Sequence, residues 1–262
     1  MLRAIARRLF HLFSRSAVGA WILYYATTWA GDTIRDGVGK GLHFNPYRSS
    51  GAYLSGRNEL PVQETLAAHL KRGDVFYDIG ANVGFFSIIA SRLVGADGSV
   101  YAFEPVAVNV ACIQRNVRAN QLSNVTVIQK AIAATSGMVD IHLTGHPGGA
   151  TLTSAGHPGD TYATTRVESA FIDELLDYNQ IAPPDMVKID VEGAEIDVLR
   201  GMARALAKFH PVVVFEIDDM DPERLAHKRE ACTDILRGFG YSIQLLDNSY
   251  DHTVEHYLAV SG

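Results

Sequence analysis

The chain has 262 residues, of which 47% are hydrophobic and 20% charged, a composition typical of a soluble globular protein with a sizeable core. The formal net charge is −6, but no acid precedes Asp32. Residues 32–262 therefore carry 19 basic (23 − 4) and 29 acidic side chains, a balance of −10, which excludes nucleic acid as a favoured partner. Two distant cysteines without a CxxC pattern exclude a disulfide framework and indicate free thiols in a reducing compartment such as the cytoplasm.

The first thirty residues differ from the rest of the chain. Their first half has apolar residues at helical spacing and arginines on the other face, which predicts an amphipathic helix. Ala17–Ala30 is apolar, but its 14 residues fall short of the roughly 20 that a membrane span needs. We expect residues 1–41 to form a helical arm that packs on the body or on a second copy in a homodimer. A helix on a membrane surface is the alternative, ahead of a targeting segment or a span.

Residues 31–58 have a loop-like composition, and strands then alternate with helices. Helices are predicted at Pro61–Leu70, Val83–Val94, Val106–Asn120, Phe171–Tyr178, Ile196–Leu206 and Pro222–Phe239. Strands are predicted at Val75–Ile79, Ser99–Phe103, Val125–Ile132, Val139–Leu143, Met186–Val191 and Val212–Ile217, with a closing pair at Tyr241–Leu246 and His256–Val260. This order predicts an α/β, doubly wound, mostly parallel sheet in one domain, residues 42–262. We expect residues 135–166, where the helical pattern lapses, to be a loop insertion near the site.

The most informative stretch is the turn after the first of these strands, with the pattern D-x-G-A-N-x-G. Gly80 and Gly84 permit a close backbone approach, and the helix that follows offers free N–H groups. Asp78 stands at the end of the strand, where it favours a cationic or amine-bearing ligand and repels a phosphate. A purely structural acid that caps the helix is the alternative for Asp78.

Two further positions fit a nucleotide-like ligand. Glu104 ends the second strand 20 residues beyond Gly84 (104 − 84), the spacing at which an acid meets ribose hydroxyls in a doubly wound sheet. Ala131 lies near the end of the third strand, where a small residue lets a base lie against the backbone. Plain core packing is the alternative for Ala131.

The segment from Met186 to Gly193 places three charged residues on one face of a strand: Lys188, Asp190 and Glu192. A central parallel strand is normally apolar on both faces, so these charges need a reason. We expect this strand beside the one that ends at Asp78, with Lys188 paired to a carboxylate and both acids near cofactor and substrate. For Glu192, the alternative is a structural role in which Glu192 or Glu195 is an acid in the first turn of the next helix.

Another buried strand ends at Glu216, followed by Asp218 and Asp219. Asp190 with Glu216 or Asp218 could hold a divalent ion. We expect these acids to bind substrate hydroxyls or to act as bases instead, and we predict no metal. The ten histidines show neither HxH nor HExxH spacing, which speaks against a transition-metal site.

Taken together, four motifs resemble the FkbM family of S-adenosylmethionine-dependent methyltransferases. They are Asp78–Gly84, Glu104-Pro105, Lys188–Gly193 and the lead-in Tyr53–Glu59. The resemblance runs from about Leu42 to the C-terminus and implies a Rossmann-like methyltransferase fold with an antiparallel last strand. It implies methyl transfer from S-adenosyl-L-methionine, usually to a hydroxyl oxygen of a sugar, glycan or natural product.

The resemblance also assigns roles to residues. The turn residues would surround the methionine part of the cofactor: Asp78, Gly80, Asn82, Gly84 and the adjoining Phe85. Glu104 would take the ribose hydroxyls, Ala131 would lie near the adenine, and Asp190 would border the methyl donor. Glu59 would lie near the donor or the acceptor.

The residues agree with this reading, because S-adenosylmethionine has no phosphate and carries a sulfonium and an ammonium. A hydroxyl acceptor needs a base, for which Asp190, Glu192 and Glu216 are unranked candidates. An NAD-type oxidoreductase is one alternative, disfavoured by Asp78 and by the missing third glycine. A non-catalytic binding or assembly module with the same fold is the other. We expect a cytoplasmic protein, with membrane association, if any, through its N-terminus.

Overall fold

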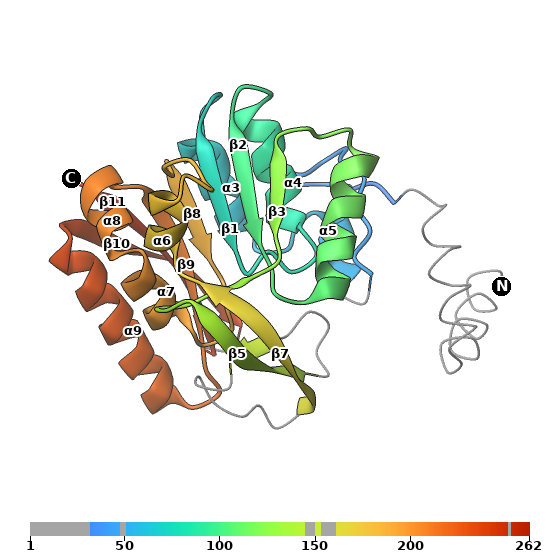
Figure 1. Ribbon diagram of the computed structural model, residues 1–262. Coiled ribbons are helices and arrows are strands. Elements are labelled where there is room, and N and C mark those ends of the chain that lie inside the picture. The colour runs from blue at the N-terminus through green and yellow to red at the C-terminus, as the bar shows by residue number, and fades with distance from the viewer. Residues whose placement is uncertain (1–31, 48–50, 145–149, 153–160, 251–252) are drawn as a thin grey trace.

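The computed structural model describes residues 32–47, 51–144, 150–152, 161–250 and 253–262 (Figure 1). The predicted N-terminal helices and the apolar stretch Ala17–Ala30 lie outside these residues. Within the described part, no helix is long and apolar enough to cross a membrane.

A seven-stranded sheet forms the centre, in the order β10-β11-β9-β8-β1-β2-β3. Its strands are β1 (Val75–Ile79), β2 (Ser99–Phe103), β3 (Val125–Ile128), β8 (Met186–Ile189), β9 (Val212–Asp218), β10 (Tyr241–Tyr250) and β11 (Val254–Ser261). All pairs are parallel except the two that β11 makes with β9 and β10. The predicted parallel sheet, its antiparallel closing pair and the placement of the Asp78 and Lys188 strands side by side are confirmed.

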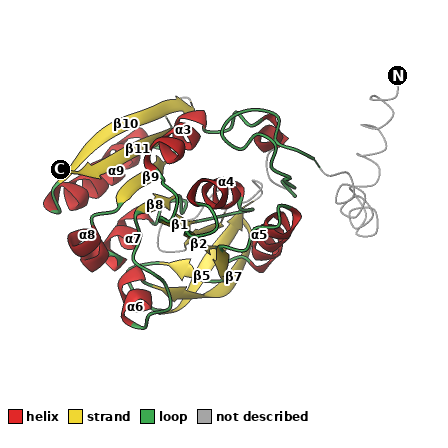
Figure 2. Ribbon diagram, turned by 90° about the horizontal axis from the view of Figure 1, so that it is seen from above, coloured by secondary structure: helices red, strands yellow, loops and turns green. Residues whose placement is uncertain are grey.

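Helices cover both faces of this sheet (Figure 2). They are η1 (Gly51–Ser55), α3 (Leu60–His69), α4 (Phe85–Val94), α5 (Ala107–Ala119), α6 (Ile172–Asp177), α7 (Glu195–Gly201), α8 (Ala203–Phe209) and α9 (Pro222–Gly238). Helices α3 to α5 pack on Phe76 and one face of β1, and α6 to α9 pack on Tyr77 and the other face. Burial on both faces explains why the strands read as continuous apolar runs.

Two expectations about the middle of the chain were wrong. The strand predicted at Val125–Ile132 ends at Ile128, and β4 (Ala131–Ile132) joins a second sheet with order β4-β7-β5-β6. The predicted strand Val139–Leu143 is confirmed within β5 (Gly137–Thr144), but the region around it, expected to be a loop, also contributes β6 (Ala150–Leu152) and β7 (Thr161–Ala170) to this sheet. Because β5 and β7 pair across a long connection (Figure 1), no local pattern revealed the pairing.

The helix predicted at Ile196–Leu206 is also divided, into α7 and α8 on either side of Met202. Gly201 ends α7 where a Cβ atom would lie 2.2 Å from the backbone oxygen of Ala133. The close approach of the two chain segments at Gly201 is therefore possible only without a side chain.

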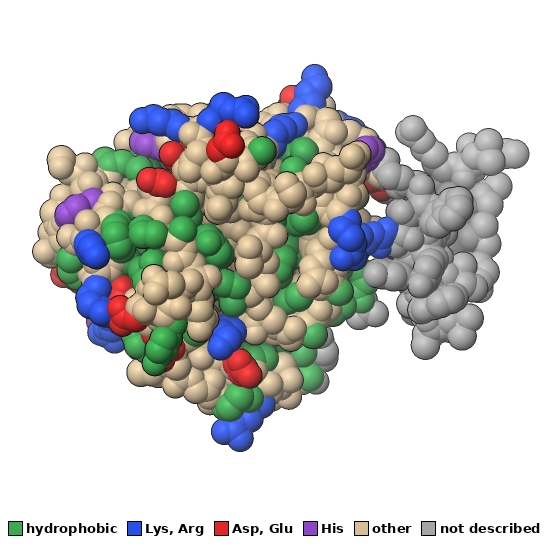
Figure 3. Space-filling view, turned by 45° about the horizontal axis from the view of Figure 1, so that its top comes forward, with side chains coloured by type: hydrophobic (Ala, Val, Ile, Leu, Met, Phe, Trp, Pro, Cys, Tyr) green, Lys and Arg blue, Asp and Glu red, His purple; other side chains and the backbone are tan. Residues whose placement is uncertain are grey.

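The acidic side chains of the protein are not all on its surface. On the face drawn in Figure 3, Lys and Arg side chains lie along the upper edge, and acidic side chains are scattered among hydrophobic ones. Several acidic residues are instead buried at the ends of the central strands, for example Asp78 and Glu104.

The turn after β1 is fixed by contacts with both neighbouring strands. Gly80 and Ala81 donate backbone hydrogen bonds to the Phe103 oxygen after β2, each at 3.0 Å. On the other side, a Cβ atom on Gly80 would lie 1.7 Å from the backbone oxygen of Asp190. Gly80 also has φ +81, so both its conformation and its space exclude a side chain.

We predict that Gly80→Ala lowers the free energy of unfolding by about 3 kcal/mol, combining a left-handed backbone with overpacking. Gly240→Ala is the matched control, since Gly240 has φ +85 and no atom within 4 Å of its would-be Cβ. The control should lose only about 1 kcal/mol. Urea unfolding measures both, and equal losses would contradict the contact with Asp190.

Candidate active site

The predicted site residues meet at the carboxyl ends of the central strands, on the face covered by α3 and α4. Asp78 of β1 lies opposite Lys188 of β8, and Glu216 of β9 lies opposite His256 of β11. Asp78, Lys188 and Glu216 each follow an apolar residue by two positions. These apolar residues belong to the core beneath α3, α4 and α5: Phe76, Met186 and Val214. Alternation along the strands therefore places a row of polar side chains on this one face.

In the turn, two buried oxygen atoms lack hydrogen-bond partners among the described residues: Asp78 Oδ1 and Asn82 Oδ1. The other carboxylate oxygen of Asp78 accepts a hydrogen bond from Ser87 Oγ at 2.5 Å. Helix α4 begins at Gly84 without any side-chain cap, so the alternative of Asp78 as a helix cap is not supported. Burial raises the pKa of Asp78, although the ammonium of Lys188 opposes this.

Buried acceptors normally have a partner, so the two free oxygens indicate a ligand that donates hydrogen bonds or carries positive charge. The ammonium and sulfonium of S-adenosylmethionine have these properties, whereas a pyrophosphate does not. The turn therefore fits this cofactor.

Glu104 is buried beside the turn and is held by backbone N–H groups. Its carboxylate accepts hydrogen bonds from the backbone of Asn82 at 2.9 Å and of Val106 at 2.8 Å, and from Asn109 Nδ2 at 3.2 Å. Burial raises the pKa of Glu104 to about 7, against the effect of these donors. The bond from Asn82 joins the acid after β2 directly to the turn after β1.

Two of the predicted cofactor residues have clear packing roles. Phe85 lies against Phe44 and Tyr53, with ring centroids 5.4 and 4.8 Å away. Ala131, in β4, packs in a small apolar cluster with Ala133, Ile141 and Ala194. The contacts that the structure describes for both residues are those of core residues.

Lys188 is the buried cation of the site. Its Nζ lies 2.7 Å from Asp190 Oδ2 and 4.6 Å from the centre of the Phe86 ring, which confirms the predicted pairing with a carboxylate. Burial alone would lower the pKa of Lys188, but the surrounding carboxylates raise it; in order of effect they are Asp190, Glu59, Asp78 and Glu216.

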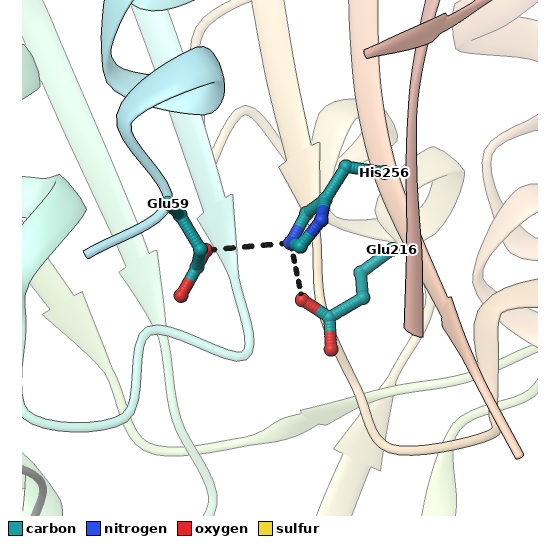
Figure 4. A group of neighbouring side chains, drawn as sticks. All are labelled: Glu59, Glu216 and His256. Atoms are coloured by element: carbon teal, nitrogen blue, oxygen red, sulfur yellow. Dashed lines mark ion pairs between the residues drawn. The ribbon is translucent and has the colours of Figure 1, made fainter. Parts of the chain in front are cut away.

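Glu59, Glu216 and His256 form a compact group (Figure 4). His256 Nε2 lies 2.8 Å from Glu216 Oε2 and 3.6 Å from Glu59 Oε2. Glu59 directly precedes α3, Glu216 lies in β9 and His256 lies in β11. Burial would lower the pKa of His256, but the two carboxylates raise it. Sequence reasoning missed His256, because its partners are 40 (256 − 216) and 197 (256 − 59) residues away and no local spacing signals the contact.

Glu192 follows β8 with φ +53, outside any helix, and the residue is exposed. Although the residue as a whole is exposed, its carboxyl group lies near Asp218 and Asp190, where desolvation and repulsion by these two carboxylates raise the pKa of Glu192 well above its ordinary value. Glu195, the other acid named in the first-turn alternative, is buried, begins α7 and accepts a hydrogen bond from the Gly193 backbone at 2.8 Å. The first-turn alternative therefore applies to Glu195 and not to Glu192.

Comparison with known proteins identifies the class of enzyme. The Methyltransferase FkbM domain matches residues 78–243. Hexuronic acid methyltransferase AglP of Haloferax volcanii is 29% identical over 184 residues, 69% of this chain and 73% of AglP. The 31-O-demethyl-FK506 methyltransferase FkbM of Streptomyces tacrolimicus is 28% identical over 207 residues, 66% of this chain and 75% of that protein.

Solved structures show the same fold. A methyltransferase FkbM from Methylobacillus flagellatus superposes with a TM-score of 0.53 and 16% identity, covering 82% of this chain and 56% of that chain. A precorrin-6y C5,15-methyltransferase from Geobacter metallireducens superposes with a TM-score of 0.51 and 17% identity, covering 81% of this chain and 94% of that chain. With the family match over most of the chain and an acid-rimmed turn that suits the methyl donor, the chain belongs to the FkbM family of S-adenosylmethionine-dependent methyltransferases.

Proposed function

We propose that the enzyme methylates a hydroxyl oxygen of a sugar, a glycan or a natural product. The observation that carries this proposal is the row of carboxylates beside the turn, which supplies proton acceptors at the edge where cofactor and acceptor meet. The names of two relatives support it, since one is a hexuronic acid methyltransferase and the other a 31-O-demethyl-FK506 methyltransferase. The NAD-type oxidoreductase and the non-catalytic module are not favoured.

The cofactor, when bound, supplies a methyl group activated by its sulfonium. Asp78, Gly80, Asn82 and Gly84 would hold its methionine part and Glu104 its ribose. The chain must orient the acceptor oxygen in line with the methyl group and take the hydroxyl proton as the oxygen–carbon bond forms. Asp190 is the best-placed proton acceptor, because its carboxylate is partly exposed at 26% while Lys188 fixes its orientation.

The affinity for S-adenosylhomocysteine should depend on pH through Glu104. Ribose hydroxyls donate to the ionised carboxylate, so binding favours the charged form. Since the pKa of Glu104 is about 7, the affinity should fall as the pH drops below 7, by up to about tenfold per unit. Calorimetry between pH 5.5 and 8 measures this.

Glu104→Gln should bind more weakly and lose this pH dependence. Glu195→Gln is the control, because burial raises the pKa of Glu195 to about 7 as well while its carboxyl contacts the start of α7. A pH dependence that survives in Glu104→Gln, or that disappears in Glu195→Gln, would count against the ribose contact.

Methyl transfer itself tests the role of Asp190. With methyl-labelled cofactor and a panel of neutral glycosides, uronic acid glycosides and polyhydroxylated macrolides, at least one acceptor should yield a methyl ether, located by NMR. Asp190→Asn should lower kcat by roughly 10²–10⁴-fold, as expected for loss of a general base. The exposed turn residue Asp97 provides the control variant, Asp97→Asn, which should keep wild-type kcat. Full activity in Asp190→Asn would rule out its role as the base.

We also propose that residues 1–30, outside the described residues, bring a cytoplasmic enzyme to a membrane surface or into a homodimer. The basic amphipathic pattern and the apolar stretch Ala17–Ala30 support this. Deleting residues 1–30 should abolish co-sedimentation with anionic vesicles or reduce the mass measured by light scattering, while S-adenosylhomocysteine binding stays unchanged. If neither measurement changes, the arm has another role.

A further inference from the structure

Glu59, Glu216 and His256 have the geometry of ligands to a single metal ion. One donor atom from each lies within 4.8 Å of the other two, and Nε2 of His256 is 2.8 and 3.6 Å from the two carboxylate oxygens. Donor atoms that share an ion at about 2.0–2.2 Å are themselves about 3–3.5 Å apart. Figure 4 shows the carboxylates of Glu59 and Glu216 beside the same imidazole nitrogen of His256, on three different segments of the chain.

The buried atoms of this group lack other partners. His256 is 1% exposed, and apart from the ion-pair contacts of Nε2 with Glu216 and Glu59, its ring nitrogens have no hydrogen-bond partner among the described residues. The same is true of Glu59 Oε2. Such atoms are rare in folded proteins, and an ion between them would satisfy both Nε2 and Glu59 Oε2.

The backbone and the carboxylate of Glu59 are held in a specific conformation beside His256. It precedes α3 with φ +45, a left-handed conformation that is costly for a residue with a side chain and tends to occur at ligand sites. Asn58 Nδ2 donates to Glu59 Oε1 at 2.6 Å. That bond orients the carboxylate and leaves Oε2 for the shared point, as outer-shell partners do in metal sites.

The charge balance favours a divalent cation. Four carboxyl groups, those of Asp190, Glu59, Asp78 and Glu216, lie near a single buried ammonium, that of Lys188. Buried carboxylates are costly unless they are compensated, so a further cation beside them is favoured.

We propose that Glu59, Glu216 and His256 bind one divalent transition-metal ion of the zinc or manganese class. One imidazole and two carboxylates suit such ions better than magnesium, which prefers oxygen donors alone. This revises the expectation of no metal, which rested on histidine spacing. Glu59 and His256 also lie outside residues 78–243, the part that matches the family.

The proposed ion also has a chemical role, and that role rests on the proposed function. Three protein ligands leave coordination positions open, and a hydroxyl bound there loses its proton more easily. The acceptor oxygen would then be held next to Asp190, whose charge acts directly on Glu216.

Metal binding is tested on the full chain, stripped with EDTA and titrated with Zn²⁺ and with Mn²⁺ by calorimetry. Bound metal is then counted by mass spectrometry. We expect one ion per chain for at least one metal, and at least tenfold weaker binding in Glu216→Gln, His256→Asn and Glu59→Gln. Glu255→Gln is the control: Glu255 neighbours His256 but points to the opposite face, where it pairs with Arg229 at 2.9 Å. The control should bind like the wild type.

Absence of stoichiometric binding, or equal affinity in all four variants, would overturn the site and leave His256 as a protonated bridge between two carboxylates. If His256→Asn fails to fold, Glu59→Gln decides the question, since it alters only the residue before α3. S-adenosylhomocysteine affinity is measured on the same samples. A wild type that binds S-adenosylhomocysteine but no metal refutes the metal site alone, whereas failure of the wild type to bind S-adenosylhomocysteine counts against the proposed function.

Discussion

The ammonium of Lys188 is the interaction on which the site depends. It lies buried in the middle of the sheet, 2.7 Å from Asp190, and carboxylates from β1, β9 and the start of α3 surround it. Without this cation, acids that converge from four segments would repel one another in a poorly hydrated space. Removing one partner of a buried ion pair typically costs about 3–5 kcal/mol, because the remaining charges stay uncompensated. Lys188 thus permits several carboxyl groups to lie close together at this edge of the sheet.

The turn after β1 is held by contacts with residues at the ends of the neighbouring strands. Gly80 lies directly against the backbone of Asp190, and Asn82 donates to Glu104. The turn, Glu104 and Asp190 are therefore connected by backbone contacts and hydrogen bonds between adjacent strand ends. A change at any of these strand ends would displace the others, since parallel strands bring their carboxyl ends to one edge.

The second sheet explains why Ala131 lies where it does. The chain leaves the main sheet after Ile128, and β4 pairs with β7 before the chain returns through α6 to β8. Ala131 is thereby placed in a small core with Ala194, which lies just after the Asp190–Gly193 segment. The region that the sequence suggested was a loop is thus a structural support beside the site.

The sequence by itself determined the elements whose signal is local. Short apolar runs predicted β1, β2 and β9 to within a residue, and the turn residues after β1 indicated a cofactor without phosphates. The sequence also predicted that the strands of Asp78 and Lys188 are neighbours, because doubly wound sheets share the strand order around the point where ligands bind. Only the tertiary structure decided what depends on distant segments. It broke the strand at Ile128, divided the helix at Gly201, and brought Glu59, Glu216 and His256 together. Those contacts join residues 157 (216 − 59) and 40 (256 − 216) positions apart, where pairing energy rather than local spacing sets the geometry.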